Sequence, residues 1–509
     1  MGIAHDTRWL DAYDQVALVR SGQLSPSELV DAAIERIEAD GHNAVIRATF
    51  ADARHTAAAA TIAAAPMAGL PFLMKDLWAA TEGQVATDGN AALKALPAPA
   101  YATDSVLVGR WRAAGVSFAG RTNTPEFGLL PTTEPDAFGP TLNPWDRTRS
   151  PGGSSGGAAA AVAAGLVPVA HASDGGGSIR IPASCCGLVG LKPSQGRISA
   201  GPGEGDEAGL GVQLVVSRSV RDTAWFLDLA AGPGVGDTIV AAPPTRPYVD
   251  EVGADPGSLR IGFLAHSPRG ELHPDGRAAV EHTAALLASL GHRVEAANPP
   301  ILDSDEYLRP FSAMWSSNTG LNLRRLSEQL GRPATADDVE PLTWALGQRA
   351  GRFSGTDLAA SLAAAVRCSA PAAGVVGGRR VGPAAHAHGR RPAAEARGDG
   401  HEPGGPDQPV PLLGWVRRVH LGVQHQPPAR HQPADALERA QRHRTRRPAR
   451  RRAARGRLRQ GRRPDPRGRP ARVGRPLGPP PPAARLTARP AARATWRASR
   501  RRPPGSGRS

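Results

Sequence analysis

Two short segments rich in glycine and serine hold the residues of this chain whose types and spacing could do chemistry. They are GGSSGG at residues 152–157 and SDGGGS at residues 173–178. A serine hydroxyl is a poor nucleophile at neutral pH, so it needs a base and preorganised donors for the developing oxyanion. Consecutive glycines let backbone N–H groups point into one concavity, which makes the second segment, ending at Ser178, an oxyanion-hole candidate.

Other interpretations of these segments are weaker or less specific. Either segment alone is more often a flexible turn. Neither is followed by Gly-Lys-Ser or Gly-Lys-Thr, which argues against a phosphate-binding Walker loop. The chain has no G-x-S-x-G nucleophile elbow with a downstream Asp and His, so the usual esterase interpretation is also weak.

With PFLMKD at residues 71–76, the two segments resemble the amidase signature family of serine hydrolases, and the resemblance covers residues 10–366. It implies a Ser–cis-Ser–Lys triad in which Ser178 is the nucleophile, Ser154 the bridging serine and Lys75 the base. It also implies a cis peptide bond before Ser154, and it implies neither a cofactor nor a metal. The remaining implied residues are the oxyanion-hole donors Gly175, Gly176 and Gly177, together with Ser178 itself, and the supporting hydroxyls of Ser155 and Ser173.

Lys75 must be neutral to act as a base, and burial away from a carboxylate lowers the pKa of a lysine. Its neighbours on the N-terminal side, Phe72, Leu73 and Met74, suit burial. Asp76 could hold it charged, but adjacent strand residues point to opposite faces. A lone lysine in such a run more often marks a solvated strand end, but the neighbouring motifs favour the base.

The second segment contains two further ionisable candidates. Asp174 and Arg180 could form an ion pair that shapes the glycine loop, and direct contact with substrate is the less favoured alternative. His171 lies just before the segment and would suggest a Ser-His pair. Its strand-like context favours a hydrogen-bonded core histidine instead.

Two other groups have mainly structural interpretations. Cys185 and Cys186 are expected to be small buried packing residues, because no metal-ligand spacing and no activating histidine lies nearby. Asn123 and Glu126 resemble a family loop near the site, and a cap or turn role is at least as well supported.

The elements that must position these residues alternate along the chain. SPSELVDAAIERIEA at residues 25–39 predicts a helix with a capping box. Short apolar runs predict strands, and residues 276–290 predict another helix. We therefore expect an α/β fold of the amidase signature type, a single domain with a large mixed sheet flanked by helices. The predicted strands are residues 70–73, 116–119, 166–170 and 259–263.

The formal charge of +16 is concentrated in the last part of the chain. Residues 368–509 hold 33 arginines, no lysine and 7 acidic residues, whereas residues 1–367 hold 29 basic and 39 acidic residues. The first part thus has the mildly acidic balance of an ordinary soluble enzyme. An Arg-rich tail could bind nucleic acid, but with so few aromatic residues it would bind only nonspecifically.

Near residue 366 the helix-like periodicity of apolar residues ends, and the Pro-, Gly- and Arg-rich segment that follows is predicted to be disordered. We therefore expect an amidase signature domain at residues 1–366, incomplete at its C-terminus, and a disordered segment at residues 367–509. With codons chosen to favour sense, back-translating residues 446–473 and reading one base later can give DGLPVGVQLVAAYGREDVLIRVAAQLE, a strand-like run followed by an amphipathic helix. This favours a reading-frame error.

We predict that the chain hydrolyses a carboxylic amide through an acyl-enzyme, and ASDGGGSIRIPAS at residues 172–184 favours a stand-alone amidase of small or cyclic amides. The alternative within the fold is an amidotransferase A subunit, which passes ammonia to a tRNA-bound substrate. A tail translated as written could instead leave a non-functional product, because net stability is only about 5–15 kcal/mol.

Three cysteines, two of them adjacent, cannot form a disulfide framework, which fits a reducing cytoplasm. The N-terminus lacks the pattern of a secretory signal, and no stretch approaches the unbroken apolar length of a membrane span. We expect a cytoplasmic enzyme whose partner is a small-molecule amide. We expect no specific nucleic acid and no membrane, and we leave a homodimer open.

Overall fold

The computed structural model describes residues 2–97, 100–202, 209–266, 272–297, 306 and 308–376, with side chains described as far as residue 368. Nearly all of the Arg- and Pro-rich tail, including the part for which we predict disorder and a frame change, lies outside these residues. The predicted boundary at residue 366 falls inside a helix, which continues to Val376.

A six-stranded mixed sheet forms the core of the fold, in the strand order β1-β3-β2-β4-β6-β5. β2 runs parallel to β3 and β4, and the other neighbouring pairs are antiparallel. The strands are β1 (Val45–Ala48), β2 (Pro71–Lys75), β3 (Ser117–Thr122), β4 (Val169–Asp174), β5 (Val189–Gly190) and β6 (Val212–Ser217). The predicted α/β class with a mixed sheet is confirmed.

β2, β3, β4 and β6 are buried along their whole length, as the central strands of a sheet with both faces covered usually are. Three strands extend beyond the predicted apolar runs and end on polar residues, such as Lys75 in β2 and Asp174 in β4. These polar groups tolerate burial because other groups of the core hydrogen-bond them. The ends of β2 and β4 therefore hold buried polar side chains in place of turn residues.

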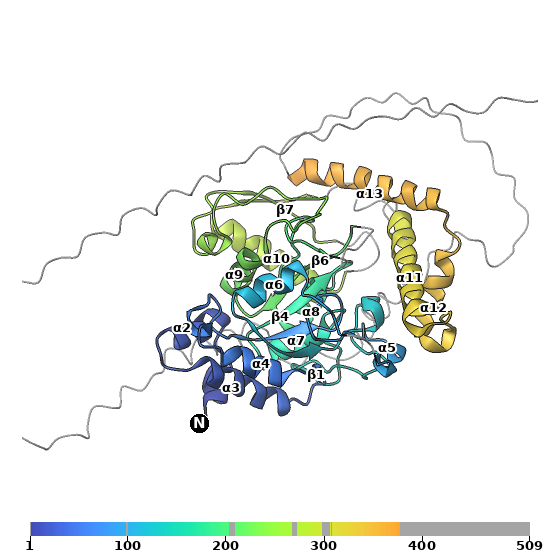
Figure 1. Ribbon diagram of the computed structural model, residues 1–509. Coiled ribbons are helices and arrows are strands. Elements are labelled where there is room, and N and C mark those ends of the chain that lie inside the picture. The colour runs from blue at the N-terminus through green and yellow to red at the C-terminus, as the bar shows by residue number, and fades with distance from the viewer. Residues whose placement is uncertain are drawn as a thin grey trace, which may run out of the picture. The chain divides into compact units, whose positions relative to one another are not determined.

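Helices cover the sheet, and Figure 1 shows it enclosed by them. The predicted capping box opens α3, where Ser25 accepts from the Glu28 amide and Glu28 accepts from the Ser25 amide at 2.8 Å. α7 packs against β1, β2, β3, β4 and β6. The helices of this part are α1 (Ile3–Thr7), α2 (Ala12–Arg20), α3 (Pro26–Glu38), α4 (Phe50–Ala57), α5 (Ala91–Ala95), α6 (Val106–Ala113), α7 (Gly156–Ala163), α8 (Arg180–Cys186) and α9 (Val220–Ala230).

A smaller βαβ unit follows, and it confirms the strand and helix predicted there. β7 (Arg260–Phe263) and β8 (Arg293–Ala296) pair in parallel, and α10 (Pro274–Ser289) lies between them in the chain. Most of its residues are partly or fully exposed, which matches its short strands and thin apolar face.

Three consecutive helices, α11 (Leu308–Leu330), α12 (Pro341–Ala350) and α13 (Gly355–Val376), end the described chain (Figure 1). α11 packs against both α12 and α13. Its Leu326 packs in a small cluster with Leu93 of α5 and Val339. Through this cluster α11 is attached to the α5 region. None of the helices that the structure describes is long and apolar enough to cross a membrane.

Candidate active site

β2 and β4 bring the predicted base to the predicted serines. Lys75 is the last residue of β2, and its Nζ donates to Ser154 Oγ at 2.7 Å and to Ser173 Oγ at 2.9 Å. Ser173 lies near the end of the parallel neighbour β4. The end of β2 thus places the Lys75 amine next to the hydroxyl of Ser173 on β4 and the hydroxyl of Ser154.

Complete burial defines the electrostatics of Lys75, whose exposed fraction is 0%. Burial lowers the pKa of Lys75 to about 7, although the charges of Asp174 and Asp88 act in the opposite direction. Asp76 points elsewhere, because its Oδ2 accepts from the Thr87 amide at 3.1 Å and from the Thr87 hydroxyl. The lysine is therefore poised to exist partly as a neutral amine near neutral pH.

Ser154 follows a cis peptide bond from Gly153, as the family resemblance implies. Gly128 leaves room for its hydroxyl, because a Cβ on Gly128 would lie 3.2 Å from Ser154 Oγ and 2.6 Å from Leu77 Cδ2. Gly128 also has φ +68°, a conformation that favours glycine. Local backbone and packing together fix the position of this serine.

Ser155 ties the start of α7 to β4 and to the nucleophile candidate. Its N–H donates to the carbonyl of Ser178 at 3.3 Å. Its Oγ accepts from the Ser173 amide at 3.2 Å and donates to the Ser173 carbonyl at 3.3 Å. The two serine-rich segments predicted to cooperate are hydrogen-bonded to each other.

Asp174 and Arg180 form the predicted ion pair, with two contacts of 2.9 Å. The same carboxylate accepts from the amides of Gly177 at 2.8 Å and Ile179 at 3.2 Å. Burial alone would raise the pKa of Asp174, but Arg180 and the two amides outweigh it and lower that pKa. Asp174 is a structural anchor for the glycine loop.

The contact between Asp174 and the glycine loop changes which backbone amides of the loop are available to an oxyanion. The Gly177 N–H already donates to Asp174, so it is not free to receive an oxyanion as we expected. In the part of the chain that the structure describes, the amides of Gly175, Gly176 and Ser178 donate to no protein group. Ser178 itself is 8% exposed. The loop thus offers three uncommitted backbone donors beside the Ser178 hydroxyl.

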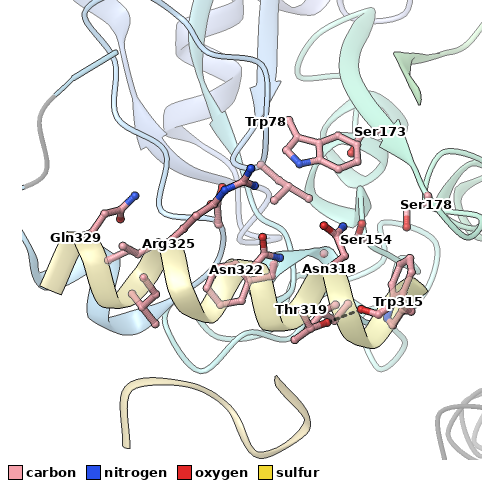
Figure 2. Close-up of a pocket in the computed structure, with 18 residues that line it drawn as sticks. Trp78, Ser154, Ser173, Ser178, Trp315, Asn318, Thr319, Asn322, Arg325 and Gln329 are labelled. Atoms are coloured by element: carbon pink, nitrogen blue, oxygen red, sulfur yellow. Dashed lines mark hydrogen bonds between the residues drawn. The ribbon is translucent and has the colours of Figure 1, made fainter. Parts of the chain in front are cut away.

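A pocket opens over these groups, and Figure 2 shows the Ser154, Ser173 and Ser178 side chains on one side of it and α11 on the other. No hydrogen bond joins Ser154 Oγ to Ser178 Oγ among the described residues. The remaining pocket residues are Leu77, Trp78, Asp88, Leu93, Phe127, Gly128, Leu129, Gly175, Trp315, Asn318, Thr319, Asn322, Arg325, Leu326 and Gln329.

The side of the pocket formed by α11, here called the α11 wall, was not predicted from the sequence. Trp315 packs against the glycine loop, since a Cβ on Gly175 would lie 3.5 Å from its ring. Asn318, Asn322 and Gln329 line the pocket from the same helix. From Trp315 onward these residues follow one another at spacings of three, four and seven, which is the signal of one helix face and could have been found in residues 308–330.

The other candidates take structural roles. His171 is fully buried, accepts from the Lys75 amide at 3.2 Å and lies 3.1 Å from Gln213 Oε1, and burial lowers its pKa to about 3. It is the neutral core histidine that we expected. The expectation for Cys185 is wrong, because this residue is exposed on α8, whereas its neighbour Cys186 is buried.

Asn123 and Glu126 hold loops together. Asn123 Nδ2 donates to Gly139 O and to Thr141 Oγ1, each at 3.0 Å. Glu126 accepts from Asn90 at 2.7 Å and from the amide of Glu340, the residue before α12, at 2.8 Å. Among the described residues there is no cluster of three or more His, Cys, Asp or Glu residues that could hold a metal ion.

The chain is similar to known amidases over most of its described length. A family model described as Amidase matches residues 28–362. The 6-aminohexanoate-cyclic-dimer hydrolase of Paenarthrobacter ureafaciens is 44% identical over 361 residues, which cover 69% of this chain and 72% of the relative.

Two solved structures extend the likeness to the fold. A structure of 6-aminohexanoate cyclic dimer hydrolase matches with a TM-score of 0.69 and 43% identity, covering 72% of this chain and 76% of that one. A bacterial aryl acylamidase of the amidase signature family matches with a TM-score of 0.66 and 28% identity, covering 72% and 77%. The chain therefore belongs to the amidase family and is an amidase signature enzyme.

Proposed function

We propose that this amidase hydrolyses its substrate through Ser178, Ser154 and Lys75. The observation that carries the proposal is the 2.7 Å contact between Lys75 Nζ and Ser154 Oγ, at a lysine without exposed surface. Ser154 and Ser178 line the same pocket. A neutral amine in that position can accept a proton from Ser154, which in turn can accept one from Ser178.

The reaction then has two balanced steps. In the first, Ser178 Oγ attacks the amide carbonyl, its proton passes by way of Ser154 to Lys75, and the tetrahedral oxyanion is held by the amides of the glycine loop. The C–N bond breaks as the same relay returns the proton to the leaving amine. In the second, water attacks the ester carbonyl and gives its proton to the relay. The ester C–O bond then breaks, the relay returns that proton to Ser178 Oγ, and the acid is released.

For the substrate we propose a small cyclic or linear amide. Among the similar proteins, one acts, by its name, on the cyclic dimer of 6-aminohexanoate, and at 44% identity it is close enough to make that compound the first to assay. A mixed wall of apolar and polar side chains suits an uncharged substrate of this kind.

The test compares Ser178→Ala with wild type on a panel of linear and cyclic amides, measuring released amine from the purified chain alone. A matched control is Ser184→Ala, an exposed serine on α8 outside the pocket. We expect hydrolysis by wild type and by the control, and loss of at least a thousandfold in Ser178→Ala. Equal turnover by all three proteins would overturn the assignment. Activity only with added partner subunits would favour an amidotransferase.

We further propose that residues beyond about 366 are out-of-frame translation and that the preceding part carries the activity. The family match ends at residue 362, and the text beyond residue 368 contains 33 arginines and no lysine. Sequencing the gene tests the first claim, and finding no base gained or lost near codon 366 relative to close relatives would contradict it. The amide assay of the chain as written tests the second, because an inactive chain would indicate a non-functional product.

A further inference from the structure

Two asparagines on one face of α11 point into the candidate active-site pocket. Asn318 and Asn322 are four residues apart, so they lie one above the other on the helix. Both line the pocket that contains Ser154 and Ser178. In Figure 2 their side chains extend from α11 into the space below Trp78.

Neither carboxamide has a hydrogen-bond partner within the described part of the chain. Other inward-facing asparagines do. Asn90 donates to Glu126 at 2.7 Å, and Asn123 donates to Thr141 Oγ1 at 3.0 Å. On α11 itself, the Thr319 hydroxyl donates to the Trp315 carbonyl at 2.9 Å. Asn318 and Asn322 are only partly exposed, and their side-chain carboxamides are available to hydrogen-bond a ligand that enters the pocket.

The surroundings of this pair combine apolar side chains with polar and charged ones such as Asp88 and Arg325. Leu77, Trp78, Phe127 and Leu129 line the pocket with them. A carboxamide carries two donors and one acceptor, which is the complement of an amide group. The glycine loop already provides three uncommitted donors for the scissile carbonyl. A ligand with a single amide would therefore leave both carboxamides unpaired when it displaces water, and unpaired buried polar groups are costly.

We propose that Asn318 and Asn322 bind a second amide group of the substrate, away from the bond that is cleaved. The preferred substrate class is then a compact diamide whose amides are separated by methylene segments, which the apolar side chains contact. This inference rests on the proposed amide hydrolysis at Ser178 and adds the substrate feature that this site selects.

The experiment measures kcat/KM for two substrates, the 6-aminohexanoate cyclic dimer and a macrocyclic monolactam of similar ring size. The variants are Asn318→Leu and Asn322→Leu, which keep the branched shape of the side chain and remove its hydrogen bonding. Glu328→Leu is the matched control, because it makes the same kind of change at an exposed position of α11 outside the pocket. Thermal unfolding of each variant verifies folding.

We expect each asparagine variant to lose about tenfold in kcat/KM on the diamide and less than about threefold on the monolactam, with the control unchanged on both. The same loss should appear as weaker diamide binding when each variant is combined with Ser178→Ala, which does not depend on turnover. Equal losses on both substrates, or no loss on the diamide, would overturn the inference. Failure of wild type to hydrolyse either substrate would instead count against the proposed function.

Discussion

The side-chain nitrogen of Lys75 and the hydroxyl oxygen of Ser154 lie 2.7 Å apart in a core where the lysine is completely buried. Burial lowers the pKa of Lys75 to about 7, and only the neutral amine can accept a proton. We expect kcat/KM to rise about tenfold per pH unit below pH 7 and to level off above it. A pH–rate profile checks this, and a rate that is flat between pH 5 and 8 would refute the role of the lysine.

The same lowered pKa makes a prediction about stability. Between pH 7 and the ordinary value of 10.5, unfolded Lys75 binds a proton that the folded protein does not, so the free energy of unfolding should rise with pH across this window. Lys75→Met removes this linkage. We expect the variant to be more stable than wild type at pH 7 by a few kcal/mol, with the difference shrinking toward pH 10. Denaturant unfolding at several pH values measures it, and a constant difference would contradict it.

Gly128 is predicted to hold Ser154 in reach of Lys75. An alanine Cβ there would lie 3.2 Å from Ser154 Oγ, whereas one on Gly139 would meet nothing within 4 Å. Both glycines have positive φ, so both alanine variants should lose about 1 kcal/mol of stability, and Gly128→Ala should lose more because its Cβ would also lie 2.6 Å from Leu77 Cδ2. Only Gly128→Ala should also lower kcat, by at least tenfold. If the two variants have the same kcat, Gly128 has no positioning role.

Asp174 is predicted to act through the glycine loop. Asp174→Ala leaves the amides of Gly177 and Ile179 and the Arg180 guanidinium without their acceptor, so the donors of the loop should lose their alignment. We expect kcat to fall about a hundredfold and KM to change much less. Asp146→Ala, which removes another Asp–Arg pair, is the control. A change confined to KM would place Asp174 in substrate binding instead.

The sequence was sufficient to predict the features that depend on residues close together in the chain. The capping box of α3, the pairing of Asp174 with Arg180 and the buried state of His171 follow from residues within a few positions of one another or from an apolar strand context. The α/β class followed from alternating periodic segments. In each case the neighbours in sequence are also the neighbours in space.

Features that depend on distant contacts could not be predicted in this way. The commitment of the Gly177 amide to Asp174 depends on how the loop turns. Exposure of Cys185 depends on which side of the short helix α8 faces the core. The α11 wall comes from residues more than a hundred positions after Ser178, and only tertiary packing brings that helix over the pocket. Periodicity shows that α11 has a face, but not what the face covers.

The identity of the nucleophile is tested most directly by labelling the purified chain with a fluorophosphonate, which modifies activated serines covalently. We predict one adduct per chain on the peptide carrying Ser178, loss of amide hydrolysis in proportion to labelling, and no adduct in Ser178→Ala. Complete inactivation with the adduct on any other residue, or equal labelling of Ser178→Ala, would contradict it.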